Sequence, residues 1–368
     1  MGSGVYTHAR ELGLELSNMG LTPFVVGTKN ASQPVSSQYI ELLKSSSFGS
    51  KFLSSKWMAP YLVEKWVRQN QRRPSILHGL SNLNLSVFHR KSKSLRYVIT
   101  VHDLIPLIAP NGVSGALHWQ MKMILPKVLA KADAIVTVSE WTSRSLIDFF
   151  PFVSAKVIHK IPNGYRSEDF NAEQYSQVIP SPSICNIDKQ DLKLVIVARG
   201  ESYKRLEKIG ELAQHLKRCH KSSFSIRLVT DVKGEAIVKR TLSGELKQNV
   251  TIYKALDTQQ LQRLYVEATV NISFSLYEGF GLPLLEALAA NTPSVFVAGS
   301  GSSEYLNPQV SVAVSSEAEI GEWYHAILRA QALKFSDKFS ETAKRHLISL
   351  PSWKDAAFRL KSLYESLT

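Results

Sequence analysis

Residues 273–300 read SFSLYEGFGLPLLEALAANTPSVFVAGS, and they carry the strongest indication of the fold in this sequence. The run 270–276 is β-branched and aromatic enough to predict a buried strand, and the apolar spacing of 282–290 predicts a helix. Gly279 and Gly281 therefore lie in a strand-to-helix turn. Because glycine has no Cβ, backbone N–H groups can face a ligand there, beside the positive end of the helix dipole. Such a turn suits a phosphate.

Two glutamates flank this turn. Glu278 follows the predicted strand and Glu286 lies inside the predicted helix, so both carboxylates can reach one crevice. A carboxylate does not attract phosphate, and its expected partners are hydroxyl groups such as those of a sugar or a ribose. A lone Gly-rich turn is more often only a tight turn with solvated neighbours. The paired glutamates and the rest of the chain favour a site for a nucleotide sugar.

The spacing of the two glutamates resembles the E-x7-E signature of retaining glycosyltransferases of family 4, which have the GT-B fold. A second stretch agrees, because the predicted strand 192–198 is followed by Arg199 and, five residues later, by Lys204. In that family such a pair grips the donor diphosphate. Two cations at a strand end are chemically suited to a pyrophosphate leaving group, although alone they would more often be surface charges.

The resemblance also implies a role for each residue of the turn. Glu278 would hold hydroxyls of the donor sugar, and Glu286 would hold the ribose. Backbone donors for the phosphates would come from Gly279, Phe280, Gly281 and Leu282.

Upstream, RYVITVHDLIPLIAP resembles the family's strand and loop that enter the cleft from the first domain. The resemblance implies that His102 contacts sugar hydroxyls near the reacting carbon, while Asp103 orients this histidine or caps the turn. A His-Asp pair that merely ends a strand is the structural alternative. DAIVTVSEWTSRSL, with a strand ending at Ser139, and PNGYRSEDF, from Pro162, resemble the family in fold rather than in chemistry.

Strand-like and helix-like runs alternate along the chain, most clearly from 192 to 328, which predicts parallel sheets covered by helices on both faces. The polar stretch 171–191 lacks periodicity and is the expected domain boundary. We therefore expect an α/β protein of the GT-B type, with two Rossmann-like, doubly wound domains facing across a cleft. The predicted parts are an acceptor-side domain (1–180), a donor-binding domain (190–345) and a C-terminal helix (350–368) returning to the first domain.

One departure from the family pattern concerns the start of the chain. Family members begin with a strand, a Gly-rich turn and a helix, whereas this chain begins at the turn, and residues 5–19 already have the pattern of the helix. Losing a central strand would expose hydrogen-bonding edges. We therefore hypothesise that the natural start lies upstream. Gly4, which the resemblance places near the donor phosphates and acceptor, is displaced in that case.

The composition permits this architecture. The chain has 368 residues, of which 44% are hydrophobic, enough for two cores. It has no apolar run of about 18 residues and no signal-peptide core, so we expect a cytoplasmic protein. Its two cysteines, Cys185 and Cys219, have no metal-ligand spacing. No cofactor or metal is expected besides the donor substrate, a UDP-sugar or a GDP-sugar.

The positive charge is concentrated in the first half. Residues 1–180 carry a net charge of +9 and the remainder +4. Between Lys44 and Arg96 there are eleven basic residues and one acid, Glu64, with aromatics interleaved and Pro60 expected to interrupt the helix. This pattern suits either an anionic membrane surface or a solvated helix with a core-facing aromatic stripe. A peripheral position at the inner face of the membrane, with a lipid-linked saccharide acceptor, would follow from the first alternative.

The sequence thus predicts a retaining, metal-independent hexosyltransferase for cell-surface polysaccharide synthesis, with mannose among the candidate sugars. Its partners would be a nucleotide-sugar donor and a saccharide or lipid-linked saccharide acceptor. Two alternatives remain open: a nucleotide-sugar epimerase of the GT-B fold, and a basic nucleic-acid-binding protein, for which the sequence contains no recognised motif.

Overall fold

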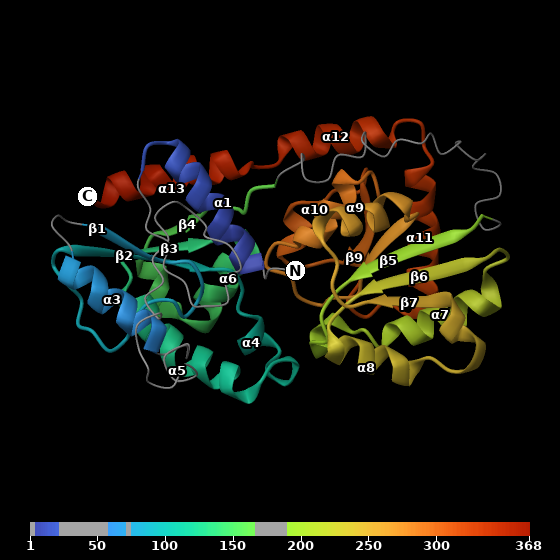
Figure 1. Cartoon of the computed structure of the whole chain (residues 1–368), viewed down its shortest axis with the longest axis horizontal. Helices are drawn as coiled ribbons and strands as arrows, with labels where there is room; N and C mark the ends of the chain where they lie inside the picture. Colours follow the sequence, from blue (N-terminus) through green and yellow to red (C-terminus); the bar gives the residue numbers. More distant parts are fainter. Residues whose placement is uncertain (1–3, 22–57, 71–74, 166–189) are drawn as a thin grey trace. The chain divides into compact units, whose positions relative to one another are not determined.

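The computed structural model describes residues 4–21, 58–70, 75–165 and 190–368. They form two compact units (Figure 1). The expected boundary at 171–191 falls almost entirely outside the described residues. The N-terminal unit comprises Gly2–Pro110, Ser114–Gly164 and Pro351–Thr368, and the C-terminal unit comprises Tyr165–Leu350 with the short segment Asn111–Val113.

The N-terminal unit is built on a parallel sheet, whose described strands follow the order β1-β2-β3-β4. The central strand β2 is buried at every position except Arg96, as expected for a strand covered on both faces. The strands are β1 (Ser75–Gly79), β2 (Leu95–Val101), β3 (Ala134–Thr137) and β4 (Ile158–Lys160).

Helices cover both faces of this sheet (Figure 1). Apolar side chains of α1 and α13 pack on one face, and those of α5 and α6 pack on the other. Ser139 begins α6 by accepting a hydrogen bond from the amide of Thr142, which is the predicted strand-then-helix arrangement. The helices are α1 (Gly4–Asn18), α3 (Met58–Asn70), α4 (Ile105–Ile108), α5 (Gly115–Lys131), α6 (Glu140–Phe149) and α13 (Trp353–Leu367), with 3-10 turns η1 (Pro110–Gly112) and η2 (Pro151–Ala155).

The C-terminal helix α13 completes the N-terminal unit. It packs against α1, and its buried side chains share a core with β2 and β3. Gly164 lies so close that a Cβ there would stand 2.1 Å from the backbone nitrogen of Trp353. The last helix therefore belongs to the same unit as the first one.

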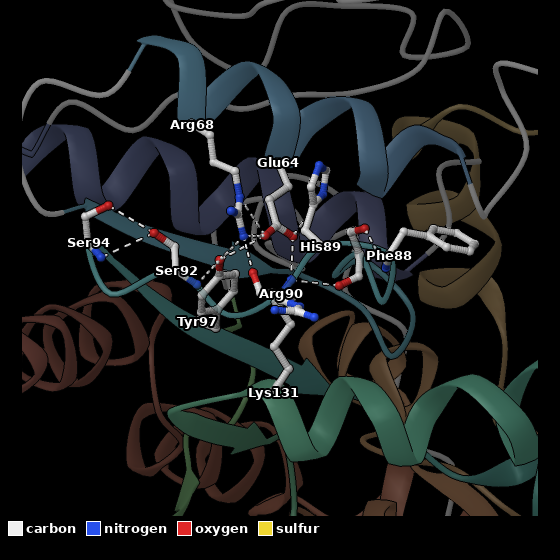
Figure 2. Close-up of polar contacts among 10 residues, drawn as sticks. Glu64, Arg68, Phe88, His89, Arg90, Ser92, Ser94, Tyr97 and Lys131 are labelled. Carbon is white, nitrogen blue, oxygen red and sulfur yellow. Dashed lines mark hydrogen bonds and ion pairs between the residues drawn. The ribbon is translucent and has the colours of Figure 1, made fainter.

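Helix α3 is anchored by Glu64, the one acid of the basic stretch (Figure 2). The Glu64 carboxylate is fully buried and accepts hydrogen bonds from Arg68 Nη2 (2.7 Å), the Tyr97 hydroxyl (2.8 Å) and Lys131 Nζ (2.6 Å). Arg68 also donates to the carbonyl of Arg90. A buried carboxylate is stable only when paired charges and hydrogen bonds surround it. Because Tyr97 lies on β2 and Lys131 on α5, these contacts tie α3 to both elements.

One expectation about this helix needs correction. Pro60 does not interrupt it, since α3 begins at Met58 and Pro60 lies in the first turn, where no intrahelical N–H bond is lost. Glu64, the one acid of the basic stretch, is the centre of a buried network. Residues 44–57 and 71–74 of the basic stretch lie outside the described residues.

The C-terminal unit has a parallel sheet in the order β10-β9-β8-β5-β6-β7. From β5 the chain winds outward to β7, returns to β8 beside β5, and then winds to the opposite edge. The connections that leave these two paired strands run in opposite directions at such a reversal, and ligands bind in the crevice there, beyond the carboxyl ends of the strands. The strands are β5 (Leu192–Val197), β6 (Phe224–Val229), β7 (Val250–Tyr253), β8 (Val270–Ser273), β9 (Ser294–Val297) and β10 (Ser311–Val314).

Here too helices lie on both faces (Figure 1). The larger core lies between the sheet and α7, α8 and α11, and a second core lies under α9 and α10. The helices are α7 (Lys208–Cys219), α8 (Val232–Thr241), α9 (Thr258–Glu267), α10 (Leu282–Ala289), α11 (Ile320–Lys334) and α12 (Phe339–Ser349), with 3-10 turns η6 (Ser202–Lys204), η7 (Gly244–Asn249) and η8 (Gly301–Glu304).

Candidate active site

The two predicted cations follow β5, at the reversal of strand order. Arg199 lies two residues beyond the strand, and its side chain is 70% exposed, with Asp231 at 3.7 Å. Lys204 ends the turn η6 and is mostly buried. The two cations therefore differ in kind: Arg199 is held loosely at the surface, whereas Lys204 is fixed.

Lys204 is fixed by Glu278. Its Nζ donates to the Glu278 Oε1 at 2.5 Å, and the two side chains are only 16% and 19% exposed. Glu278 comes from the loop after β8, so the ion pair bridges the two strands at which the sheet order reverses. Sequence reasoning gave these residues separate partners, and the structure brings them together. A lysine ammonium has three donors, so Lys204 can hold Glu278 and still face an anion.

The strand before this loop is shorter than expected. β8 ends at Ser273 rather than at Leu276, because the chain then turns across η6, with the Leu276 amide donating to the Tyr203 carbonyl at 2.9 Å. Glu278 consequently stands five residues beyond the strand, in a loop braced by η6.

The Gly-Phe-Gly turn precedes α10 as predicted. Gly281 is the N-cap residue with φ +89°, a left-handed conformation that favours glycine. It offers no side-chain cap. Pro283 has no amide hydrogen and the Leu284 amide donates to the Gly281 carbonyl at 3.0 Å, so in this first turn the Leu282 amide is the donor that suits an anion. The Gly301 amide donates to the Glu278 carbonyl at 2.8 Å, and a Cβ on Gly301 would stand 2.2 Å from the Gly279 carbonyl oxygen. The turn is therefore backed closely by η8.

The Phe280 side chain is buried inside the C-terminal unit. Its ring is 6% exposed and packs against Tyr305 with ring centroids 4.3 Å apart. Of this residue only the backbone is placed to contact a ligand. The side chain anchors the turn instead.

Glu286 lies on α10, facing α9. The hydroxyl of the buried Tyr265 donates to Glu286 Oε2 over 3.4 Å, and burial together with this carboxylate raises the pKa of Tyr265 well above its usual value. The phenol therefore stays protonated and orients the glutamate.

Two residues that sequence reasoning missed hold this edge of the sheet. Asp231 caps α8 and accepts from the amides of both Gly234 (2.9 Å) and Gly200 (3.1 Å). Burial raises the pKa of Asp231, but the hydrogen bonds from the two amides outweigh it and leave this pKa below its usual value. Arg205, the residue after Lys204, donates hydrogen bonds to the carbonyls of Phe274 and Ser316 and so holds the end of η6 in place. An Asp between a strand and a helix is a recognisable N-cap signal, whereas nothing in the sequence indicated Arg205.

His102 belongs to the N-terminal unit and follows β2. Its Nε2 donates to the carbonyl of Leu80 at 2.9 Å, so the neutral ring has an unprotonated Nδ1. Burial lowers the pKa of His102. The backbone on either side is fixed, because Asn82 accepts from the His102 amide and Thr142 donates to the His102 carbonyl. Asp103 accepts from the amide of Ile105 and so caps the turn into α4.

A second histidine, not anticipated from the sequence, packs against His102. His8, on α1, lies edge-on to it with ring centroids 4.7 Å apart. The Nδ1 of His8 lies 2.7 Å from the side-chain oxygen of the buried Asn163, and its Nε2 has no partner among the described residues. Burial, and then the neighbouring His102, lower the pKa of His8 well below its usual value. Both rings are therefore neutral near pH 7. Gly4 lies in the first turn of α1 rather than in a preceding loop.

Within the described residues, no cluster of His, Cys, Asp and Glu has the geometry to hold a metal ion. In the same part of the chain, no helix has the length and apolar character needed to cross a membrane.

Two family models match the chain. Residues 2–169 match the model described as Glycosyltransferase Family 4, and residues 181–346 match Glycosyl transferases group 1.

Curated relatives are distant. The O-antigen chain mannosyltransferase RfbU of Salmonella typhimurium is 25% identical over 64% of this chain, and the match spans only 60% of that relative. The MMP alpha-(1->4)-mannosyltransferase of Mycolicibacterium hassiacum is 21% identical over 79% of this chain and 70% of its own length.

Solved structures agree on the fold. Sucrose-phosphate synthase from Thermosynechococcus elongatus has a TM-score of 0.76 at 20% identity, and the match covers 100% of this chain and 94% of the synthase chain. WaaG, a glycosyltransferase involved in lipopolysaccharide biosynthesis, has a TM-score of 0.68 at 13% identity, and the match covers 99% of this chain and 96% of WaaG. With two parallel-sheet units and both family models matched, the chain belongs to the GT-B glycosyltransferases of the family 4 type.

Proposed function

We propose that this glycosyltransferase moves a hexose, with mannose the first candidate, from a UDP-sugar or GDP-sugar to a saccharide hydroxyl with retention of anomeric configuration. The observation that carries the proposal is the Lys204–Glu278 pair, which lies where the strand order reverses. Its Nζ and Oε1 atoms are 2.5 Å apart, so a cation for the diphosphate stands beside a carboxylate that can accept hydrogen bonds from sugar hydroxyls. The mannosyltransferase names of the relatives support the choice of sugar.

Each residue of the site has a proposed task. Lys204 and Arg199 stabilise the diphosphate as its negative charge grows, which is what a metal ion does in other transferases. The amides of the Gly-Phe-Gly turn hold a phosphate at the start of α10. Glu278 accepts hydrogen bonds from the sugar, and Glu286, oriented by Tyr265, accepts them from the ribose.

The proposed reaction proceeds on one face of the sugar. The bond from the anomeric carbon to the diphosphate oxygen breaks, the acceptor oxygen bonds to that carbon from the same side, and a diphosphate oxygen takes the acceptor proton. His102 keeps the role that the family resemblance gives it, with its unprotonated Nδ1 available to a sugar hydroxyl.

The first test is a thermal-shift screen against UDP, GDP, ADP and their sugar conjugates, with EDTA or with magnesium. Ligand at about 100 times its Kd stabilises by about 2.7 kcal/mol, which is measurable as a higher melting temperature. We expect one nucleotide class to stabilise the protein equally with EDTA and with magnesium. Stabilisation by no nucleotide would contradict the proposed donor site, and stabilisation only with magnesium would contradict metal independence.

The second test removes either member of the central pair. We expect Lys204→Ala and Glu278→Ala each to lower kcat/KM by roughly 100-fold or more, because each loses a contact to the reacting groups. A matched control is Glu267→Ala, which removes the surface ion pair to Arg227 (2.5 Å) in the same unit and should keep full activity. A fully active Glu278→Ala would refute the role of that carboxylate. NMR of the product should show the donor's anomeric configuration.

We also propose a peripheral membrane position, which would suit a lipid-linked acceptor. On α5, Trp119 and Met123 are 52% and 46% exposed beside the exposed Lys122 and Lys127. Aromatic and basic side chains on one helix suit an anionic lipid surface. The protein should co-sediment with anionic liposomes at low salt but not with neutral ones, and Lys122→Glu/Lys127→Glu should weaken this. Binding to nucleic acid instead, with sequence preference at moderate salt, would favour the alternative function.

A further inference from the structure

Arg205 stands out because its backbone is left-handed. Its φ is +50°, a conformation that L-residues other than Asn and Asp seldom adopt. The turn lets two neighbouring side chains diverge: Lys204 reaches Glu278, while Leu206 is 1% exposed in the core under α7. Glycine would adopt this backbone at no steric cost, whereas for arginine the contacts of the side chain must offset the backbone strain.

The side chain of Arg205 bridges two loops. Its Nε donates to the carbonyl of Phe274, just beyond β8, and its Nη1 donates to the carbonyl of Ser316, beyond β10, each at 2.8 Å. Together with the Tyr203–Leu276 backbone bond, these contacts join η6 to the loop that carries Glu278.

This arrangement is costly for a charged group. Arg205 is partly buried, and burial lowers its pKa although Glu207, Glu317 and Glu211 favour the charged form. Its two hydrogen bonds go to neutral carbonyls, and Nη2 is buried with no hydrogen-bond partner among the described residues. A planar guanidinium can reach two carbonyls at once, which a lysine ammonium on a flexible chain does not reproduce.

We infer that Arg205 is a positioning residue of the donor site: by locking η6 to the loop after β8, it holds Lys204 against Glu278 in the geometry that receives the donor diphosphate. This inference rests on the proposed function. Arg205 itself is directed at carbonyl groups of the protein and acts on the ligand through Lys204.

A double-mutant cycle tests the inference. The affinity for UDP or GDP, whichever the thermal-shift screen selects, is measured by calorimetry for the wild type, Arg205→Lys, Lys204→Ala and the double variant. Residues coupled in one network show non-additive effects. We expect Arg205→Lys to weaken binding roughly tenfold when Lys204 is present and less than twofold when it is absent.

Two further variants separate positioning from stability. Arg205→Gly relieves the left-handed backbone but removes the bridge, so binding should weaken at least as much as in Arg205→Lys. Arg227→Lys, at the surface pair with Glu267 in the same unit, should bind like the wild type. A merely unstable variant would bind with unchanged Kd and a smaller active fraction.

The outcomes are distinguishable. Equal loss in both backgrounds, or wild-type binding by Arg205→Lys, overturns the inference while the proposed function stands. If Lys204→Ala itself binds the nucleotide like the wild type, the proposed role of Lys204 is wrong, and the inference about Arg205 falls with it.

Discussion

The stability of the N-terminal unit depends on single buried histidines, such as His78, staying neutral. The Nδ1 of His78 lies 2.6 Å from the Tyr364 hydroxyl, its Nε2 lies 2.8 Å from the Thr100 hydroxyl, and burial lowers its pKa to about 3. In the unfolded chain the pKa is about 6.5, so between about 6.5 and 3 the unfolded state binds more protons. The resulting stability is complete above about pH 6.5 and is lost progressively as the pH falls.

We therefore expect the melting temperature of the N-terminal unit to fall between pH 7 and pH 5. The upper limit for His78 is about 1.4 kcal/mol per pH unit, reduced by its residual solvent exposure. His78→Gln, which keeps two hydrogen-bonding atoms, should flatten the acid side of the profile. A profile as steep in His78→Gln as in the wild type would assign the acid sensitivity to other groups, with His8 and His102 next in line.

At the scale of an element, the attachment of α3 depends on one carboxylate. Glu64→Ala leaves Lys131, whose side chain is 8% exposed, and Arg68 without their buried partner. We expect a loss of about 3–5 kcal/mol in the free energy of unfolding, because an unpaired buried charge is penalised by desolvation. Denaturant unfolding of the N-terminal unit measures it. The control Glu140→Ala breaks an exposed pair with Arg144 on α6 and should change stability by less than about 0.5 kcal/mol.

For the whole molecule, the chain's last helix stabilises its first unit. Deleting Pro351–Thr368 removes Trp353, Leu360 and Leu363 from the core shared with α1. Since each large core side chain contributes about 2–5 kcal/mol, the N-terminal unit should unfold at ordinary temperature. The C-terminal unit should keep its own melting transition and its stabilisation by nucleotide. Phe358→Ala, at a side chain that is 64% exposed on the same helix, should leave both transitions unchanged.

Local patterns in the sequence were enough to predict which segments are strands, helices and turns. Alternating apolar runs predicted the strands and helices of the C-terminal unit, and the glycines between β8 and α10 predicted the turn, because periodicity and glycine conformation are local properties. The E-x7-E spacing and the cations after β5 indicated the family, which the family models confirm.

Which residues come into contact became visible in the folded chain alone. Lys204 and Glu278 are 74 positions apart, and Lys131 and Glu64 are 67 apart, so their pairing depends on which strands and helices become neighbours. The reversal of strand order that brings β5 beside β8 is a long-range choice, fixed by how two helical layers bury the two faces of one sheet. For the same reason a pattern along the chain could not reveal that Arg205 bridges two distant loops.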